Sequence, residues 1–198
     1  MQRLLSALAV MLVVTAIGAV AVEARANLNG AYAFTTAQSC TVANDPFGTD
    51  ASGAPTVIPA GGVFRQVTVN TGIDTFNVNG TGTSIGQAHT MNITNTAAGA
   101  SIFSISDFSN PFTYTVNDDN TVDVSFGVAT FTTVAGGGTG NTGTVTGTSR
   151  QFRIGNGGNT LVGQGGDIQQ ETLTLNILND GTITQYRICT RSSTLVRN

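Results

Sequence analysis

Lysine is absent from this chain, and histidine and cysteine are rare: the 198 residues include eight Arg, two Cys and one His. Without Lys, the chain cannot form a lysine Schiff base with a substrate or supply the Lys of a P-loop nucleotide site. The single residue His89 allows at most one Ser/His/Asp arrangement. These absences exclude several classes of enzyme, and no catalytic constellation is evident.

Glutamate is also rare, because Glu171 is the one Glu after residue 26. A pair of carboxylates for acid/base catalysis would therefore need Asp residues. Most of these, such as Asp118, Asp119 and Asp180, fall in predicted turns, where Asp typically bonds backbone groups. The residues after 26 carry six Arg and ten acidic side chains, a net charge of −4. A mildly acidic chain without Lys argues against binding to nucleic acid or to anionic membranes.

The first 26 residues have the pattern of a secretory signal peptide. Met1-Gln2-Arg3 is positively charged, residues 4–22 are uncharged and apolar, and Ala24 and Ala26 supply the small residues of a cleavage site. An uncleaved membrane anchor is the alternative, because about 19 apolar residues can just span a bilayer. We predict cleavage, because the site directly follows the apolar run. Residues 27–198 then form one domain, secreted or periplasmic in a bacterium, with no membrane attachment after cleavage.

The two cysteines lie near opposite ends of the predicted domain. In an oxidising compartment, Cys40 and Cys189 are expected to form a disulfide. The loop-entropy model gives such a bond an upper estimate of roughly 5 kcal/mol of stability. Two unpaired thiols are the alternative. A metal site is not expected, because two Cys and one His supply too few ligands.

Thr, Gly and Asn together make up over a third of the chain, and alternating apolar and polar residues recur throughout residues 27–198. Thr favours strands, whereas Gly and Asn favour the turns between them. The predicted strands are 31–36, 63–70, 74–78, 83–94, 102–108, 112–117, 121–133, 143–154, 160–163, 171–179 and 182–191. Turn signals lie at Asn79-Gly80, Asn117–Asn120 and Asn179–Gly181. We predict an all-β antiparallel meander of about 9 to 11 strands closed as a barrel, with a β-sandwich as the alternative.

Two segments, 41–62 and 135–143, are predicted to be loops. The Gly-rich run from Gly155 to Asp167 invites comparison with calcium-binding β-roll repeats. Asn159 stands where that motif has its ligand Asp, and fewer than two repeats are present. A hairpin with Gly-rich ends is the better interpretation, and no cofactor is expected.

Arg65 and His89 lie among apolar neighbours in the predicted strands. Arg65 alternates with Val residues, and His89 shares a face with Ile and Met residues. If these faces line the barrel, Arg65 and His89 would bind a carboxylate or another anionic group inside it, while the apolar side chains hold the rest of the ligand. The alternative is that a bulge or strand end turns each to water. Further candidates for the rim or the cavity are Tyr114, Tyr186, Arg187 and Arg191.

Three short motifs carry a resemblance to known proteins. They are an early G-x-Y-x-F strand (Gly30–Phe34), the hairpin Y-T-V-N-D-D-N-T-V (Tyr114–Val122) and the closing Y-R-I-C-T-R (Tyr186–Arg191). Together they resemble a group of uncharacterised secreted bacterial proteins that look like calycin or allene-oxide-cyclase-like barrels. The resemblance implies an antiparallel barrel with a central cavity, and it carries over no catalytic residues.

A second motif points elsewhere. Ser39-Cys40-Thr41-Val42 followed by Phe47-Gly48 is similar to the opening of spore-coat-U-type and fimbrial subunits. Those domains polymerise by strand donation, so this resemblance implies a structural or adhesive role at the cell surface.

Three functional hypotheses follow. The first is an exported barrel that binds a small apolar or anionic ligand without catalysis. The second is a pilin-like structural or adhesive subunit, and the third is an enzyme with a site in the barrel cavity. The sequence does not indicate the oligomeric state.

Overall fold

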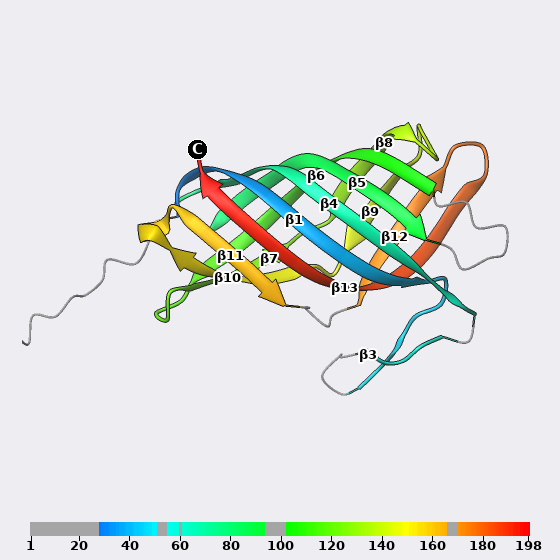
Figure 1. Ribbon diagram of the computed structural model, residues 1–198, viewed down its shortest axis with the longest axis horizontal. Coiled ribbons are helices and arrows are strands. Elements are labelled where there is room, and N and C mark those ends of the chain that lie inside the picture. The colour runs from blue at the N-terminus through cyan, green and yellow to red at the C-terminus, as the bar shows by residue number, and fades with distance from the viewer. Residues whose placement is uncertain (1–27, 51–54, 60, 94–101, 166–169) are drawn as a thin grey trace, which may run out of the picture.

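The computed structural model describes residues 28–50, 55–59, 61–93, 102–165 and 170–198. Eleven strands form one antiparallel sheet (Figure 1). They are β1 (Gly30–Ala43), β4 (Val63–Phe76), β5 (Thr81–Ile93), β6 (Ile102–Val116), β7 (Thr121–Phe126), β8 (Ala129–Gly136), β9 (Thr142–Thr146), β10 (Ser149–Gly155), β11 (Thr160–Gly165), β12 (Glu171–Ile177) and β13 (Gly181–Arg197). The all-β class and the antiparallel meander are confirmed.

The sheet closes on itself because the last strand pairs with the first. β13 pairs with β1 along twelve residue positions, and Cys40 is the register partner of Cys189. Eight strands stand around the ring at any height, because three positions are each shared by two short strands: β7 and β8, β10 and β9, and β11 and β12. The predicted Cys40–Cys189 disulfide is confirmed, and it joins β1 to β13 at this closure.

The predicted turns lie at one or the other end of the ring. Asn77–Gly80 joins β4 to β5, Asn117–Asn120 joins β6 to β7, and residues 178–180 join β12 to β13. Asn120 and Asn179 have φ of 61° and 69°, in the left-handed region that Asn tolerates better than most residues. The hairpin signals read from the sequence are confirmed.

Several strands run further than the sequence predicts. The predicted strands 102–108 and 112–117 are one strand, β6, although it contains Pro111. The Pro111 carbonyl accepts a hydrogen bond from Gly127 N (2.7 Å), so this side of the residue faces the break between β7 and β8. A proline lacks the N–H that a continuous partner strand would require, and the break removes that requirement.

The segment 41–62, predicted as a loop, contains more structure than expected. β1 continues to Ala43, and β2 (Gly48–Thr49) pairs with β3 (Pro55–Val57) in a small separate sheet. A 3₁₀ helix, η1 (Asn156–Gly158), lies in the connection between β10 and β11. The predicted signal peptide, residues 1–26, lies outside the described residues. Among the residues that are described, no helix has the length and apolar character to cross a membrane.

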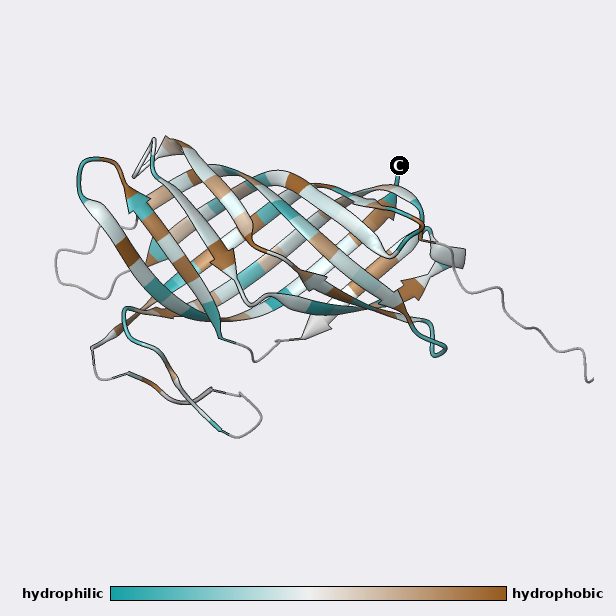
Figure 2. Ribbon diagram, turned by 180° about the vertical axis from the view of Figure 1, so that it is seen from behind, coloured by the Kyte–Doolittle hydropathy of each residue, from teal (hydrophilic) through white to brown (hydrophobic). Residues whose placement is uncertain are grey.

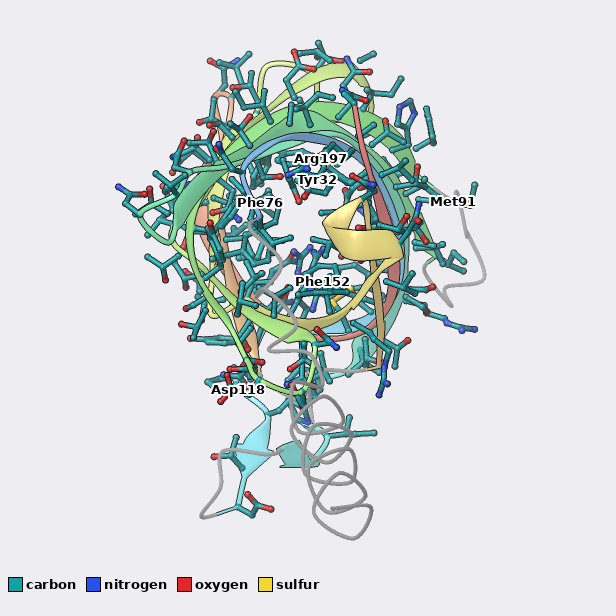
Figure 3. The ribbon with its side chains drawn as sticks, turned by 90° about the vertical axis from the view of Figure 1, so that its left-hand side faces the viewer. Tyr32, Phe76, Met91, Asp118, Phe152 and Arg197 are labelled. Carbon is teal, nitrogen blue, oxygen red and sulfur yellow. A yellow bond between two sulfur atoms is a disulfide. The ribbon has the colours of Figure 1, made fainter. Side chains whose placement is uncertain are left out.

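Side chains alternate between the inside and the outside of the ring. In β1, β4 and β5 the even-numbered residues point inward, as the burial of Tyr32, Gln66 and Ser84 shows. Figure 2 shows the corresponding alternation of hydrophobic and hydrophilic residues along the strands. Viewed along the barrel, Tyr32 and Phe152 lie inside the ring and Met91 lies outside it (Figure 3).

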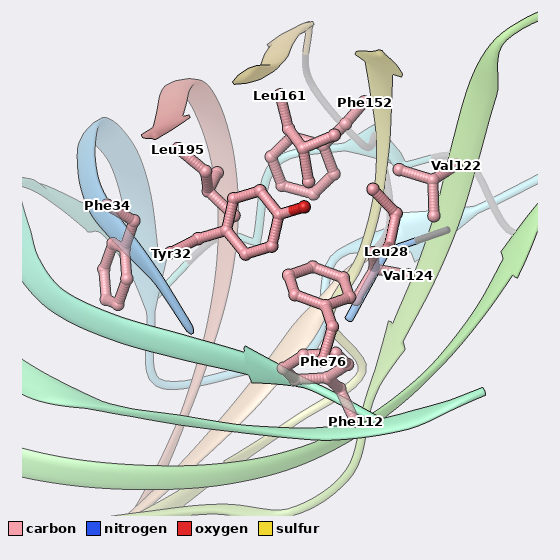
Figure 4. Packing of buried hydrophobic residues seen from close by; sticks show 10 residues of the cluster. All are labelled: Leu28, Tyr32, Phe34, Phe76, Phe112, Val122, Val124, Phe152, Leu161 and Leu195. Carbon is pink, nitrogen blue, oxygen red and sulfur yellow. The ribbon is translucent and has the colours of Figure 1, made fainter. Parts of the chain in front are cut away.

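A hydrophobic core fills one end of the barrel, near the chain's C-terminus. Its buried members, shown in Figure 4, are Leu28, Tyr32, Phe34, Phe76, Phe112, Val122, Val124, Phe152, Leu161 and Leu195. The rings of Phe76 and Tyr32 meet edge to face with centroids 5.2 Å apart, a favoured aromatic geometry. Tyr32 also donates a hydrogen bond to the carbonyl of Gly158 in η1 (2.6 Å), so this end is closed by packing.

Two glycines face each other on β4 and β5 beside this core. Gly72 in β4 and Gly86 in β5 are register partners, and a methyl group on either would overlap the backbone carbonyl of the opposite strand. Phe34 and Phe108 are the next partners on either side, and their ring centroids lie 6.2 Å apart. The glycines therefore leave space that these two rings share.

Candidate functional site

Two cavities lie inside the ring, beyond the hydrophobic core. The inner cavity has a volume of about 100 Å³ and is lined by Phe34, Gln38, Asn70, Asp74, Ser84, Phe108, Asn110, Phe126, Ala129, Phe131, Val145, Thr148, Arg150, Arg187 and Arg191. The mouth cavity, of about 360 Å³, lies at the end opposite the core. Phe131, Val145 and Arg187 line both, so the two cavities are neighbours.

The mouth cavity has two chemically different walls. β4, β5 and β6 contribute polar groups, including Gln66 and Asn92, whose amides are hydrogen-bonded to each other (3.0 Å). The opposite wall is apolar and is formed by Val145, Leu173, Leu175, Ile177 and Ile183. The volume of the mouth cavity, about 360 Å³, falls within the range of small-molecule sites, roughly 300 to 1,000 Å³.

Glu171, Arg187 and Arg191, here called the closure layer, lie where β12 meets β13. Glu171 is 1% exposed and accepts hydrogen bonds from Arg187 Nε (2.7 Å), Thr148 Oγ1 (2.8 Å) and Arg191 Nη2. Burial alone would raise the pKa of this carboxyl, but the two guanidinium groups and the hydrogen bonds outweigh burial and lower the pKa to about 2.

The closure layer is tied to the rest of the wall. Arg187 Nη1 donates to Gln66 Oε1 (2.9 Å) and Arg191 Nε donates to Gln38 Oε1 (3.1 Å). Cys189 stands between the two arginines on the same inward face, and its Sγ lies 3.8 Å from Glu171 Oε2. The layer therefore joins β12, β13, β1 and β4 around one carboxylate.

Asp74, Ser84 and Asn110, here called the polar row, lie side by side on β4, β5 and β6. Asp74 is the register partner of Ser84, and Ser84 is the partner of Asn110. All three are buried, with exposed fractions of 6%, 4% and 8%. Asp74 Oδ1 and Asn110 Oδ1 have no hydrogen-bond partner among the described residues. Asp74 and Asn110 both line the inner cavity, so the two acceptor atoms without donors belong to the wall of that cavity.

Aromatic rings flank the polar row on both sides along the strands. Phe34 and Phe108 lie two residues away in the direction of the mouth, and Phe76 and Phe112 lie two residues away in the direction of the core. Apolar neighbours cannot solvate a charge, and burial raises the pKa of Asp74 to about 6, against smaller opposing effects of the Ser84 hydrogen bond and the Arg150 charge.

Arg150 of β10 reaches into the same region from the opposite side of the ring. Its guanidinium lies over the Phe126 ring, 5.1 Å from the centroid, and Nη1 lies 3.3 Å from Thr36 Oγ1 and 3.4 Å from Ser193 Oγ. The inner cavity therefore has one carboxylate, three side-chain amides and three guanidinium groups among its lining.

The prediction that Arg65 and His89 lean into the barrel is wrong. Both lie on the outer face, where Arg65 Nη2 contacts Ser39 Oγ (3.4 Å) and the His89 ring lies 6.4 Å from the Phe103 centroid. Their apolar neighbours Val67 and Met91 are 37% and 43% exposed. The inward positions of these strand segments belong instead to polar residues that are hydrogen-bonded to one another.

The other candidates divide between the two faces. Tyr114 points inward at the core end, where its hydroxyl lies 2.7 Å from the carbonyl oxygens of Leu28 and Asn77, so it does not line either cavity. Tyr186 is outward, because its neighbours Gln185 and Arg187 point into the mouth cavity. Arg187 and Arg191 do line the inner cavity.

The polar row carries a local sequence pattern of its own. Gly82-Thr83-Ser84-Ile85-Gly86 has the G-x-S-x-G spacing of a hydrolase nucleophile elbow. That elbow requires a sharp strand-to-helix turn, whereas Ser84 lies within the extended strand β5. Ser84 points inward and His89 outward, so the chain's single His is not positioned to activate this hydroxyl. The pattern does not mark a catalytic serine here.

Within the ranges that the structure describes, no group of three His, Cys, Asp or Glu residues is arranged to hold a metal ion. Comparison with known proteins finds no family model that matches the chain, no curated protein similar in sequence and no solved structure similar in fold. A function for the barrel interior must therefore be inferred from the residues that line its cavities.

Proposed function

We propose that this chain is an exported β-barrel protein that binds a small, partly apolar ligand inside the barrel without catalysis. The observation that carries the proposal is the pair of neighbouring cavities within a closed ring, at the end of the barrel that the hydrophobic core leaves unfilled. A small barrel usually fills its interior with side chains, and space of this size is typical of ligand-binding barrels.

The walls of the mouth cavity suit an amphipathic molecule. Leu173, Leu175 and Ile183 would contact the apolar part of the ligand, and the amide and hydroxyl groups of the facing wall would bind its polar part. Arg187, which lines both cavities, stands where the ligand would pass from one to the other.

Closure of the ring favours this function over a strand-donating surface subunit. β1 and β13 are both paired on each side by the chain's own strands, so neither is left as a free edge. Donation of a strand to another copy would require such an edge.

The disulfide bears on where the protein works. Cys40–Cys189 indicates an oxidising setting outside the cytoplasm. Export through a cleaved signal peptide at residues 1–26 is part of the proposal, and sequencing the N-terminus of the exported protein tests it.

Native mass spectrometry of the protein purified from its own host tests ligand binding. We expect a species heavier than the bare chain by the mass of a small molecule. Thr90→Phe places a ring in the mouth cavity and should abolish the added mass, whereas His89→Phe, one residue away on the outer face, should retain it. A bare chain alone, or added mass that Thr90→Phe leaves unchanged, would overturn the proposal.

A further inference from the structure

Two buried oxygen atoms in the inner cavity lack the donors that buried acceptors normally have. Asp74 and Asn110 are each more than nine-tenths buried, yet Asp74 Oδ1 and Asn110 Oδ1 have no hydrogen-bond partner in the described part of the chain. Buried polar atoms are nearly always paired, because an unpaired one loses its hydration without compensation. A molecule that enters the cavity can supply the missing donors.

The distance between Asp74 and Asn110 limits the size of a molecule that could donate hydrogen bonds to both side chains. Asp74 and Asn110 lie two strands apart with Ser84 between them, and adjacent strands are separated by about 4.8 Å, so the two side chains start roughly 10 Å apart. Hydrogen bonds of about 2.8 Å from each side leave a span that hydroxyl groups on one six-membered ring can bridge. The inner cavity, about 100 Å³, is below the roughly 300 Å³ of usual small-molecule sites, so the rest of such a ring would extend toward the mouth cavity.

The charges around the cavity narrow the chemistry further. Arg150, Arg187 and Arg191 line the cavity and disfavour a cationic amine. A carboxylate or a fully deprotonated phosphate brings no hydrogen to donate, and its charge would lie beside the carboxylate of Asp74 and the oxygen of Asn110. Neutral hydroxyl groups avoid the repulsion of a cation by the arginines and of an anion by Asp74. A hydroxyl can donate to each oxygen without carrying charge.

The remaining walls provide the contacts that the carbon skeleton of such a molecule needs. Phe34, Phe108, Phe126 and Phe131 line the same cavity as the polar row. The C–H faces of a polyol ring can pack against these rings by dispersion, while its hydroxyl groups point to the polar row.

We infer that the polar row Asp74–Ser84–Asn110 binds a neutral, polyhydroxylated ring, such as a sugar or a cyclic polyol, either free or as the head group of a larger ligand. This inference rests on the proposed function, because the group reaches the inner cavity through the mouth cavity. It assigns the polar head of the ligand to the inner cavity and the apolar part to the mouth.

Isothermal titration calorimetry on the exported protein tests this assignment. The probes are myo-inositol and D-glucose as neutral polyols, D-glucosamine as the cationic analogue and D-gluconate as the anionic one. We expect a neutral polyol to bind at least tenfold more tightly than either charged analogue.

Variants connect the binding to the polar row. Asn110→Leu removes one acceptor at similar size and should weaken polyol binding at least tenfold, the loss expected for one buried hydrogen bond to the ligand. Ser84→Ala provides a second variant if Asn110→Leu does not fold. Asp107→Asn changes an outward carboxyl on the same strand as Asn110, where it accepts a hydrogen bond from Gln87, and should leave binding unchanged.

Each outcome decides between the two proposals. Unchanged binding in both Asn110→Leu and Ser84→Ala, or tighter binding of a charged analogue, would overturn the assignment of the polar row. If no polyol binds while native mass spectrometry shows another ligand, the assignment is wrong and the proposed function remains. If neither experiment shows a ligand, water alone satisfies the two oxygens and both proposals are wrong.

Discussion

Glu171 and Asp74 are both carboxyl groups buried in the same barrel, but their surroundings are opposite. Glu171 lies between two arginines and accepts hydrogen bonds on both oxygens, and its pKa falls to about 2. Asp74 lies between layers of aromatic rings with one oxygen unpaired in the described part of the protein, and burial raises its pKa to about 6. Both oxygens of Glu171 have hydrogen-bond partners within the protein, whereas Asp74 Oδ1 has none among the described residues.

Under our proposal, this difference separates a structural region, the closure layer, from a ligand-binding one, the polar row. The closure layer holds together the strands where the ring closes, and it needs nothing from outside the chain. The polar row costs stability in the free protein, because its acceptors are desolvated without replacement. Groups that cost stability without a structural benefit are candidates for function.

The largest effect should come from Glu171→Gln. This change leaves Arg187 and Arg191 buried without their carboxylate, and breaking a buried ion pair from one side costs about 3–5 kcal/mol. Urea unfolding at pH 7 measures the loss. Asp123→Asn, which changes an exposed carboxyl that accepts a hydrogen bond from Gln151, is the matched control and should shift stability by less than about 0.5 kcal/mol. Similar losses in the two variants would show that the closure layer contributes little.

The disulfide belongs to the structural region as well. Reduction of Cys40–Cys189, or replacement of both residues by Ala, should lower the free energy of unfolding by about 2–4 kcal/mol. The physical reason is that the bond closes a loop between residues 149 positions apart and restricts the unfolded chain. An unchanged melting temperature after complete reduction, checked by thiol titration, is the result that contradicts this prediction.

Asp74→Asn should raise the free energy of unfolding at neutral pH, whereas the two changes above should lower it. The folded protein keeps a proton on Asp74 up to about pH 6, whereas the unfolded chain releases it near the ordinary value of 3.8. The wild-type protein therefore loses stability as the pH rises from about 4 to 6, and the loss persists above pH 6. Two pKa units correspond to about 3 kcal/mol, which is the upper limit of the stabilisation expected for Asp74→Asn above pH 7.

A pH series of urea unfolding curves tests whether Asp74→Asn raises the free energy of unfolding above pH 7. The difference between Asp74→Asn and the wild type should vanish below about pH 3, where the wild-type carboxyl is protonated in both the folded and the unfolded state. Stability lost in the variant above pH 7, or a difference independent of pH, would mean that Asp74 is satisfied in the folded protein.

The smallest effects should come from the outer face. Arg65→Gln and His89→Gln change residues on the outer face, outside both cavities, and should alter the free energy of unfolding by less than about 0.5 kcal/mol. Ligand occupancy measured by mass spectrometry should be unchanged. Loss of the ligand in either variant would move the binding site to the outer face.

Much of the fold could be predicted from local patterns. The alternation of apolar and polar residues predicts strands, and Asn79-Gly80 and Asn179–Gly181 predict hairpins. Two cysteines in a chain with the pattern of a signal peptide predict the disulfide. These features depend on short-range chemistry, so a single sequence contains them.

The direction of each face could not be read from hydrophobicity alone. In β4, Val67 and Val69 point outward while Gln66 and Thr68 point inward, because the inner positions are hydrogen-bonded to Arg187 and Thr90 from other strands. One signal was available: Phe76 lies on the same face of β4 as Gln66, and large aromatic residues indicate the core side more reliably than valines.

The candidate site was harder to predict than the fold. Arg187 and Arg191 were among the candidates, whereas Asp74, Asn110 and Arg150 were not, since each is an ordinary polar residue within a strand. Their importance comes from register: Asp74 and Asn110 are 36 positions apart in the sequence and meet across β5. Such pairings between distant strands are not visible in local patterns.

The electron density beside Asp74 Oδ1 and Asn110 Oδ1 tests the central claim most directly. It should come from a crystal structure of the protein purified from its own host, at a resolution that shows ordered water. We predict density for an organic molecule with hydroxyl groups within hydrogen-bond distance of both oxygens. Water alone at this position, or protein donors on both oxygens, would contradict the claim that the polar row is a binding site.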